Sequence, residues 1–192
     1  MSEIRFDGRV AVITGAGGGL GRTYALEIAR RGGMVVCNDL GGKGDGSGAS
    51  SSLADETVKQ ITEAGGKAVA NYDSVTTPEG GEAIVEAALD NFGRVDVVIN
   101  NAGILRDKTF AKLTPADLDV LLDVHLKGAF YVTQPAFRAM KEQNYGRILF
   151  TASGPACSAT SGRATTAPPR WAWSGSRTCW RRRARRTTSR AT

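Results

Sequence analysis

Residues 14–21 form a glycine-rich segment, Thr-Gly-Ala-Gly-Gly-Gly-Leu-Gly, whose composition suits the binding of a phosphate group. The segment follows the apolar run of residues 9–14, which is typical of a β-strand, and precedes residues 19–31, whose apolar positions recur at helical spacing. Glycines let the backbone approach a pyrophosphate, and the free N–H groups at a helix start attract its negative charge. This context predicts dinucleotide binding; the alternative is a tight glycine turn that binds no ligand.

A carboxylate follows at the position that such a site requires. Asp39 closes the apolar run of residues 34–37, 24 residues after Gly15. At a strand end, a carboxylate can accept hydrogen bonds from the adenosine ribose and repels a 2′-phosphate, so NAD is expected rather than NADP. The alternative is an ordinary exposed turn aspartate. No metal site is expected, because Cys37, Cys157 and Cys179 lack metal-ligand spacing and suggest reduced thiols in a cytoplasmic protein.

The elements that would position these residues alternate between strand and helix. Helices are expected at residues 19–31, at 53–64, before Gly93, and from Thr114 to about Lys141. Strands are expected at residues 9–14, 34–37, 67–71, 95–99 and 146–151. The alternation predicts an α/β fold, a doubly wound parallel Rossmann sheet of about five strands, in residues 1–153. No apolar stretch is long enough to span a membrane.

The composition changes sharply after residue 153. Residues 154–192 contain nine Arg and no Asp, Glu or Lys, which leaves 16 basic against 19 acidic residues in residues 1–153. The net charge of +6 therefore comes from the tail, and the preceding domain is mildly acidic. The tail shows neither helical nor strand periodicity, so an irregular or disordered segment is expected. An Arg-rich, Trp-containing tail also allows a nucleic-acid-binding arm, which is the less favoured interpretation.

Two motifs together resemble the signatures of the short-chain dehydrogenase/reductase family. They are the glycine segment of residues 14–21 and Asn100-Asn-Ala-Gly103 at the end of the fourth expected strand. The wider sequence, over residues 5–153, is similar to the (3R)-hydroxyacyl-CoA dehydrogenase domain of peroxisomal multifunctional enzymes and their bacterial relatives. The segments that carry this similarity are Asn38–Gly42, Asn71–Val75, Asn100–Asp107, Val124–Gly128 and Tyr145–Ile148.

The resemblance implies a set of cofactor-binding residues, an NAD cofactor and a small-molecule substrate, such as an acyl-CoA. Asp39 would hold the adenosine ribose, and Asp73, with Ser74 beside it, would reach the adenine; for Asp73 the alternative is a strand-end turn residue. The other implied contacts are Thr14, Gly15, Gly19, Leu20 and Gly21 at the pyrophosphate, and Asn101, Ala102 and Gly103 along the cofactor. Family members usually assemble into homo-oligomers.

The catalytic residues are only partly present. Ser153 matches the family's serine, and His125 occupies the helix position usually held by asparagine, where a core histidine is an equal alternative. The family's tyrosine and lysine would fall at Thr166 and Arg170. A threonine hydroxyl is far too weak an acid to replace the phenol, and arginine differs from lysine in shape and reach. The chain as written is therefore expected to be inactive.

A shift of the reading frame would explain the tail. Back-translation of residues 157–172 in the neighbouring frame permits a family-like sequence with tyrosine and lysine at the family's spacing. The hypothesis is that one base was lost near residues 154–155, so that a truncated domain is followed by a frame-shifted tail. Resequencing the gene tests this idea, and an intact frame through that point would contradict it. Two functions remain open: an NAD-dependent dehydrogenase of secondary alcohols, such as 3-hydroxyacyl thioesters, and a catalytically dead NAD-binding fragment.

Overall fold

Five parallel strands form the centre of the molecule. The computed structural model describes residues 3–42, 45, 47–48, 51–106, 108–152 and 163–164. The strands lie in the order β3-β2-β1-β4-β6, and each hydrogen-bonded pair is parallel. Their bounds are β1 (Val10–Thr14), β2 (Met34–Asn38), β3 (Lys67–Asn71), β4 (Val97–Asn100) and β6 (Arg147–Phe150). These are the five strands that the sequence predicts, with boundaries moved by one or two residues.

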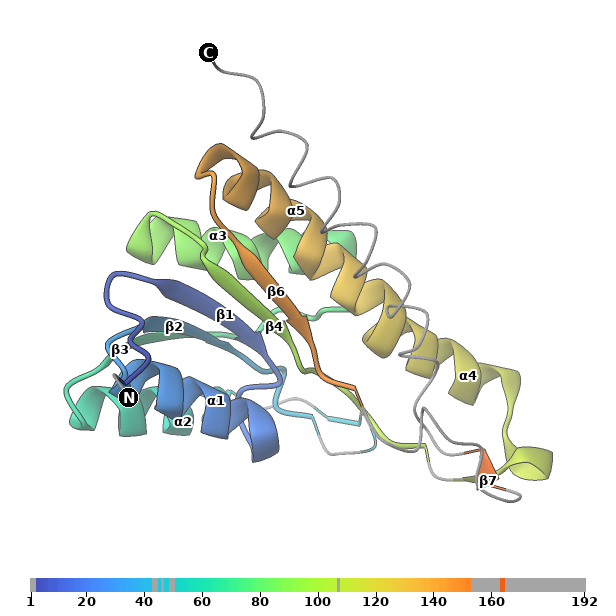
Figure 1. The fold of residues 1–192 in the computed structure, drawn as a ribbon. Helices are drawn as coiled ribbons and strands as arrows, with labels where there is room; N and C mark the ends of the chain where they lie inside the picture. Colours follow the sequence, from blue (N-terminus) through green and yellow to red (C-terminus); the bar gives the residue numbers. More distant parts are fainter. Residues whose placement is uncertain are drawn as a thin grey trace, which may run out of the picture.

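Helices cover both faces of this sheet (Figure 1). On one face lie α1 (Gly19–Arg30) and α2 (Ser52–Glu63), and on the other lie α3 (Pro78–Phe92) and α5 (Gly128–Glu142). β1 is central, since β2 and β4 flank it on opposite sides. The predicted doubly wound Rossmann architecture is therefore confirmed, and the carboxyl ends of β1, β2 and β4 meet at one edge.

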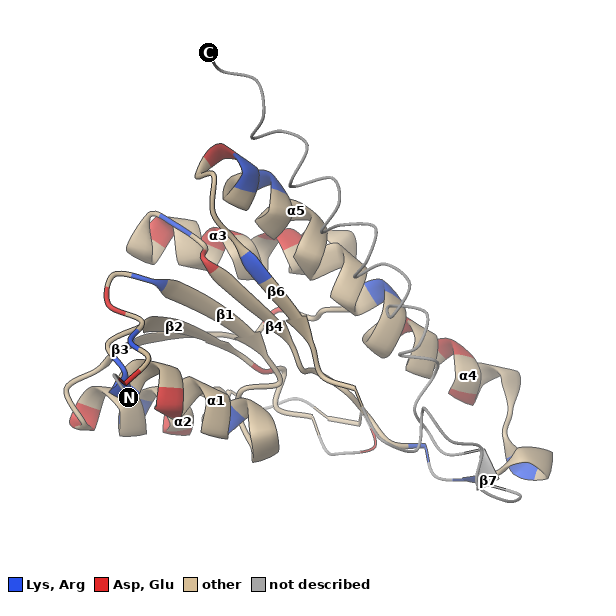
Figure 2. Cartoon of the chain, viewed as in Figure 1, with Lys and Arg blue, Asp and Glu red and all other residues tan. Residues whose placement is uncertain are grey.

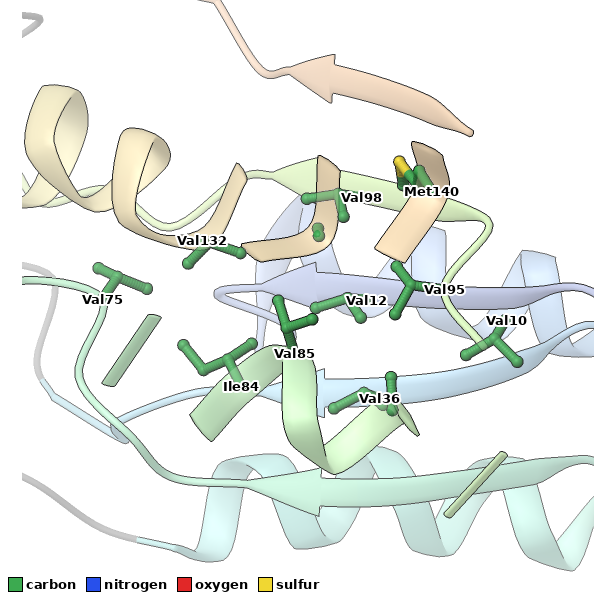
Figure 3. Close-up of a cluster of buried hydrophobic side chains, with 12 residues drawn as sticks. Val10, Val12, Val36, Val75, Ile84, Val85, Val95, Val98, Val132 and Met140 are labelled. Carbon is green, nitrogen blue, oxygen red and sulfur yellow. The ribbon is translucent and has the colours of Figure 1, made fainter. Parts of the chain in front are cut away.

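The strands are apolar because each side of the sheet is covered. Every residue of β1 is buried, and successive side chains enter two different cores. Val10 and Val12 pack with residues of α3 and α5, as Figure 3 shows, whereas Ala11 and Ile13 pack with residues of α1 and α2. Packing on both faces holds β1 in place, and this positions the glycine segment that follows it.

The long helix predicted from Thr114 to Lys141 is interrupted. Thr114 caps α4 (Pro115–Leu122) in a reciprocal arrangement with Asp117, as the predicted helix start requires. A π-helical turn, Asp123–Lys127, then separates α4 from α5. The chain is therefore helical over the predicted length, and the π-helical turn within it is a feature that the sequence did not predict. Such turns insert an extra residue into the helical ladder and often occur at functional sites; this one contains His125.

Two short strands lie outside the main sheet. β5 (Lys108–Thr109) pairs antiparallel with β7 (Arg163–Ala164), and a 3-10 turn (Phe110–Lys112) follows β5. β7 belongs to the tail for which no regular structure was expected. Two-residue strands leave no periodic pattern in a sequence, which explains why this pair was not predicted.

Charged residues lie mainly on the helices and at strand ends (Figure 2). A buried charge lies just before β4, at the amino-terminal edge of the sheet. Asp96 is fully buried and accepts hydrogen bonds from Arg9 (2.7 Å), from Arg94 (2.7 Å) and from the Val10 N–H (3.0 Å). Burial acts to raise the pKa of Asp96, but these hydrogen bonds hold it below its usual value. The network joins β1 to β4 at the edge opposite the candidate site.

Candidate functional site

The glycine segment turns sharply from β1 into α1. Gly15 has φ +66° and Gly19 has φ +49°, a region that favours glycine. A Cβ atom at Gly21 would lie 2.0 Å from the Gly15 carbonyl oxygen, and one at Gly15 would lie 3.0 Å from Ala102 Cα. Gly15 and Gly21 are therefore required for close packing of the segment against itself and against the turn after β4.

The outer surface of the segment is open. Among the described residues, no atom would lie within 4 Å of a Cβ atom at Gly18 or Gly19. Within the described residues, no side chain caps α1 and its first turn has no acidic residue, so its N–H groups have no anionic side-chain partner. Leu20, in the same turn, is 58% exposed. An open surface with helix N–H donors fits a pyrophosphate group.

Thr14 and Asn101 join the segment to the turn after β4. The Thr14 hydroxyl accepts hydrogen bonds from the Asn101 N–H (3.1 Å) and the Ala102 N–H (3.0 Å). The Asn101 amide donates in return to the carbonyl oxygens of Thr14 (3.1 Å) and Gly15 (3.2 Å). Thr151, just after β6, donates to Asn101 Oδ1 over 3.3 Å. These bonds hold the ends of β1, β4 and β6 in fixed register, and Gly103 continues the same turn.

Asp39 lies at the end of β2, half-buried beside the glycine segment. Its Oδ2 accepts a hydrogen bond from the Gly17 N–H (2.8 Å), and its Oδ1 accepts one from the Gly41 N–H (2.7 Å). Each carboxylate oxygen can accept more than one hydrogen bond, so both retain capacity for ribose hydroxyls. Asp39 is thus adjacent to the open segment, as a ribose-binding carboxylate must be.

Asp73 and Ser74 follow β3 at the same edge of the sheet. Asp73 is exposed, and its carboxylate accepts a hydrogen bond from the Asn71 amide (2.7 Å). Asn38, at the end of β2, donates to the Asp73 carbonyl oxygen (2.9 Å) and to Asn71 Oδ1 (2.8 Å). The Ser74 hydroxyl lies 2.8 Å from that of Thr76. This network places Asp73 and Ser74 next to the strand that carries Asp39.

His125 faces the segment that follows the Asn100–Gly103 turn. Its Nε2 lies 2.9 Å from the Ile104 carbonyl oxygen and 3.2 Å from the Ile104 nitrogen. His125 also lines a cavity between the ends of β1, β4 and β6 and the start of α5, with Thr14, Asn100, Phe150 and Thr151. Asn100 is 6% exposed there, and its Oδ1 has no hydrogen-bond partner among the described residues. His125 therefore contacts the backbone next to the predicted site.

The family model for short chain dehydrogenases matches residues 9–165. The chain belongs to the short chain dehydrogenase family. Members of this family with this fold generally bind nicotinamide dinucleotides. The match covers the glycine segment, the Asn100–Gly103 turn and His125, so the predicted family resemblance is confirmed.

Individual relatives of this short chain dehydrogenase are similar over the same region. The chain is 59% identical over 152 residues to the mouse peroxisomal multifunctional enzyme type 2, which covers 79% of this chain and 20% of that protein. It is 56% identical over 151 residues to the Saccharomyces cerevisiae peroxisomal hydratase-dehydrogenase-epimerase, covering 79% of this chain and 17% of that protein. The chain thus spans about a fifth of the length of these two relatives.

A solved structure shows the same fold. The crystal structure of a short chain dehydrogenase from Mycobacterium avium superposes with a TM-score of 0.75 and 39% sequence identity. The superposition covers 84% of this chain and 60% of that chain. The similarity supports the assignment of the five-stranded sheet and its covering helices to this dehydrogenase family.

Several predicted features of this short chain dehydrogenase lie outside the described residues. These are Ser153, Thr166 and Arg170, so the catalytic assignments and the domain boundary at residue 153 stay predictions. In the part of the chain that the structure describes, no helix is long and apolar enough to cross a membrane. The same residues contain no group of three His, Cys, Asp or Glu side chains that could hold a metal ion.

Sequence reasoning missed some residues that shape the site. Asn38 and Asn71 end neighbouring strands with amide side chains, a signal that was available at the strand ends. Thr57 on α2 and Thr151 after β6 gave a weaker signal, because a single threonine in an otherwise ordinary element is common. Both are recognised only once the fold brings them next to the glycine segment or to Asn101.

Proposed function

We propose that this chain binds NAD along residues 14–21, Asp39, Asp73 and Asn101. One observation carries the proposal: the open backbone at Gly18 and Gly19 lies beside the carboxylate of Asp39. The first turn of α1 supplies N–H donors for the pyrophosphate, and Asp39 supplies acceptors for the ribose. Leu20 is exposed beside this backbone, where a bound dinucleotide would cover it.

The preference for NAD over NADP rests on charge. A 2′-phosphate on the adenosine ribose would bring its negative charge close to the Asp39 carboxylate. Two backbone N–H groups already hold this carboxylate in place, so it cannot easily turn away. We therefore expect tighter binding of NADH than of NADPH.

The proposed reaction of the parent enzyme is the interconversion of a secondary alcohol and a ketone, with a 3-hydroxyacyl thioester as the favoured substrate class. The name of the yeast relative includes a dehydrogenase activity, which supports the reaction type, and the thioester substrate class rests on the sequence resemblance. A bound nicotinamide ring supplies the hydride chemistry. The chain's own contribution is to bind and orient the dinucleotide and to present the hydroxyl of Ser153 to the reacting oxygen.

A second candidate function is NAD binding without turnover. Thr166 and Arg170 stand where the family has its tyrosine and lysine, so no phenol is available to take the substrate proton. We propose this function for the chain as written, and dehydrogenase activity for a chain whose reading frame is restored after residue 153.

One experiment tests both parts. NADH and NADPH binding are measured by fluorescence titration, and oxidation of a 3-hydroxyacyl thioester is measured with NAD, on the literal chain and on the frame-restored chain. We expect both to bind NADH and only the restored chain to turn over. A folded literal chain without affinity for either dinucleotide would refute the binding proposal. Turnover by the literal chain would refute its assignment as inactive.

A further inference from the structure

The peptide unit between Ala16 and Gly17 is held at both of its polar ends. The Ala16 carbonyl oxygen accepts a hydrogen bond from the Thr57 hydroxyl (3.0 Å), and the Gly17 N–H donates to Asp39 Oδ2 (2.8 Å). The preceding Ala16 N–H donates to the Asn38 carbonyl oxygen (2.9 Å). This part of the glycine segment is therefore bound to β2 and α2, and its N–H group is directed at Asp39.

Thr57 is a fully buried polar side chain on α2. Its hydroxyl accepts a hydrogen bond from Arg22 Nε over 3.1 Å. The single hydroxyl hydrogen can then go to the Ala16 carbonyl oxygen at 3.0 Å or to the carbonyl oxygen of Leu53 in its own helix at 3.2 Å. The shorter contact favours Ala16, so Thr57 connects α1, α2 and the glycine segment.

The hydroxyl of Thr57 is not needed to fill space. Ile61, another buried residue of α2, belongs to the apolar core on this face of the sheet. A valine has nearly the same shape as threonine and a better fit to an apolar helix face, since it carries no polar group that burial must compensate. A threonine at this position is therefore explained by the hydrogen bonds that its hydroxyl makes.

We propose that Thr57 is a positioning residue for the dinucleotide site: together with Asp39, it fixes the orientation of the Ala16–Gly17 peptide. This inference rests on the proposed NAD-binding function. With that peptide fixed, the N–H groups left for the phosphates are those of the first turn of α1, next to the open surface at Gly18 and Gly19. α2 thus preorganises the binding segment although it contributes no group to the ligand.

The test compares three variants of the full chain. Thr57→Val removes the hydroxyl, Thr57→Ser keeps it, and Thr62→Val makes the same change on the same helix at an exposed position. Among the described residues, the partners of the Thr62 hydroxyl are the carbonyl oxygens of Val58 and Lys59, both within α2. NADH dissociation constants are measured well below the unfolding transition of each variant, and amide exchange at Gly17 is followed by NMR in the free protein.

We expect Thr57→Val to weaken NADH binding about five- to tenfold, the effect of losing one hydrogen bond that orders the site. Thr57→Ser should bind within about twofold of the unchanged chain, as should Thr62→Val, since each retains the hydroxyl at position 57. Gly17 should be protected from exchange in the unchanged chain, and Thr57→Val should reduce this protection.

Two results would overturn the inference. One is a folded Thr57→Val variant that binds NADH as tightly as the unchanged chain. The other is an unprotected Gly17 amide in the unchanged chain, a measurement that decides the question even if Thr57→Val does not fold. Absence of NADH binding by a folded, unchanged chain with a protected Gly17 amide would instead refute the proposed function, while the fixed peptide itself would stand.

Discussion

Replacing Gly21 by alanine should disrupt the packing of the glycine segment against itself. A Cβ atom at position 21 would lie 2.0 Å from the Gly15 carbonyl oxygen, and such contacts are essentially never shorter than 3.0 Å, so the two must separate by at least 1.0 Å. The Asn101 amide donates to the same oxygen over 3.2 Å. The shift therefore strains a packed turn and breaks or lengthens one hydrogen bond.

The expected cost follows from these two effects. Overpacking of a tight site costs about 1–3 kcal/mol and a hydrogen bond about 1 kcal/mol, so Gly21→Ala should lower the free energy of unfolding by about 2–4 kcal/mol. The methyl group of Gly19→Ala meets no atom of the described residues within 4 Å but the backbone keeps φ +49°, so only the cost of left-handed backbone, about 1–2 kcal/mol, is expected. Gly18→Ala is the control, because its backbone is extended and its surroundings are open.

Urea denaturation and NADH titration of the three variants provide the measurement. The order of destabilisation should be Gly21→Ala, then Gly19→Ala, with Gly18→Ala close to the unchanged chain. NADH binding should be lost in Gly21→Ala and weakened in Gly19→Ala, whose added methyl group enters the open surface. A Gly21→Ala variant as stable as Gly18→Ala would show that the contact with Gly15 does not constrain the turn.

Three further changes test other parts of the structure. Thr14→Val should lower the free energy of unfolding by about 2–4 kcal/mol in urea titrations, because two N–H groups lose their acceptor. Thr14→Ser keeps the hydroxyl and should retain most of this stability. Equal stability of the two variants would contradict the role of the hydroxyl. Asp96→Asn should cost about 3 kcal/mol, since Asp96 is buried between Arg9 and Arg94. Because the pKa of Asp96 is lowered, its contribution is present above its ordinary pKa and is lost as the pH falls below it, so the variant should show a shallower acid dependence. Burial raises the pKa of the Cys37 thiol to about 12, so the reactive thiolate form is scarce at pH 8. In a chain with Cys157→Ser and Cys179→Ser, alkylation by iodoacetamide at pH 8 should therefore proceed only as fast as unfolding. Rapid labelling of the folded protein would show that Cys37 is accessible.

The fold could be predicted because its signals are local and repeated. Continuous apolar runs such as residues 95–99, each followed by a helix, leave few arrangements other than a parallel sheet covered on both faces. The glycine segment was predicted because its neighbours on either side are a strand and a helix, and Asp39 because it ends the next strand. Each of these inferences needs only residues close together in the sequence.

Other features depend on contacts between distant segments. The π-helical turn at Asp123–Lys127 lies in a sequence whose apolar spacing continues through it, so only the structure reveals the interruption. The role of Thr57 arises from its contact with Ala16, 41 positions away in the sequence. The hydrogen bonds of Asp39 to Gly17 and Gly41 could likewise not be predicted from the sequence, because a carboxylate at a strand end has several possible partners.

β1 lies between β2 and β4, so the chain leaves its central strand toward one side of the sheet and later returns on the other. All proposed coenzyme contacts fall within the first 103 residues, whereas the proposed catalytic Ser153 follows β6. The proposed coenzyme binding and the proposed catalysis therefore depend on successive segments of the chain. A mutation that alters the sequence after β6 would then give a chain that still binds one molecule of coenzyme but does not catalyse the reaction. Such a chain would lower the concentration of free coenzyme in the cell.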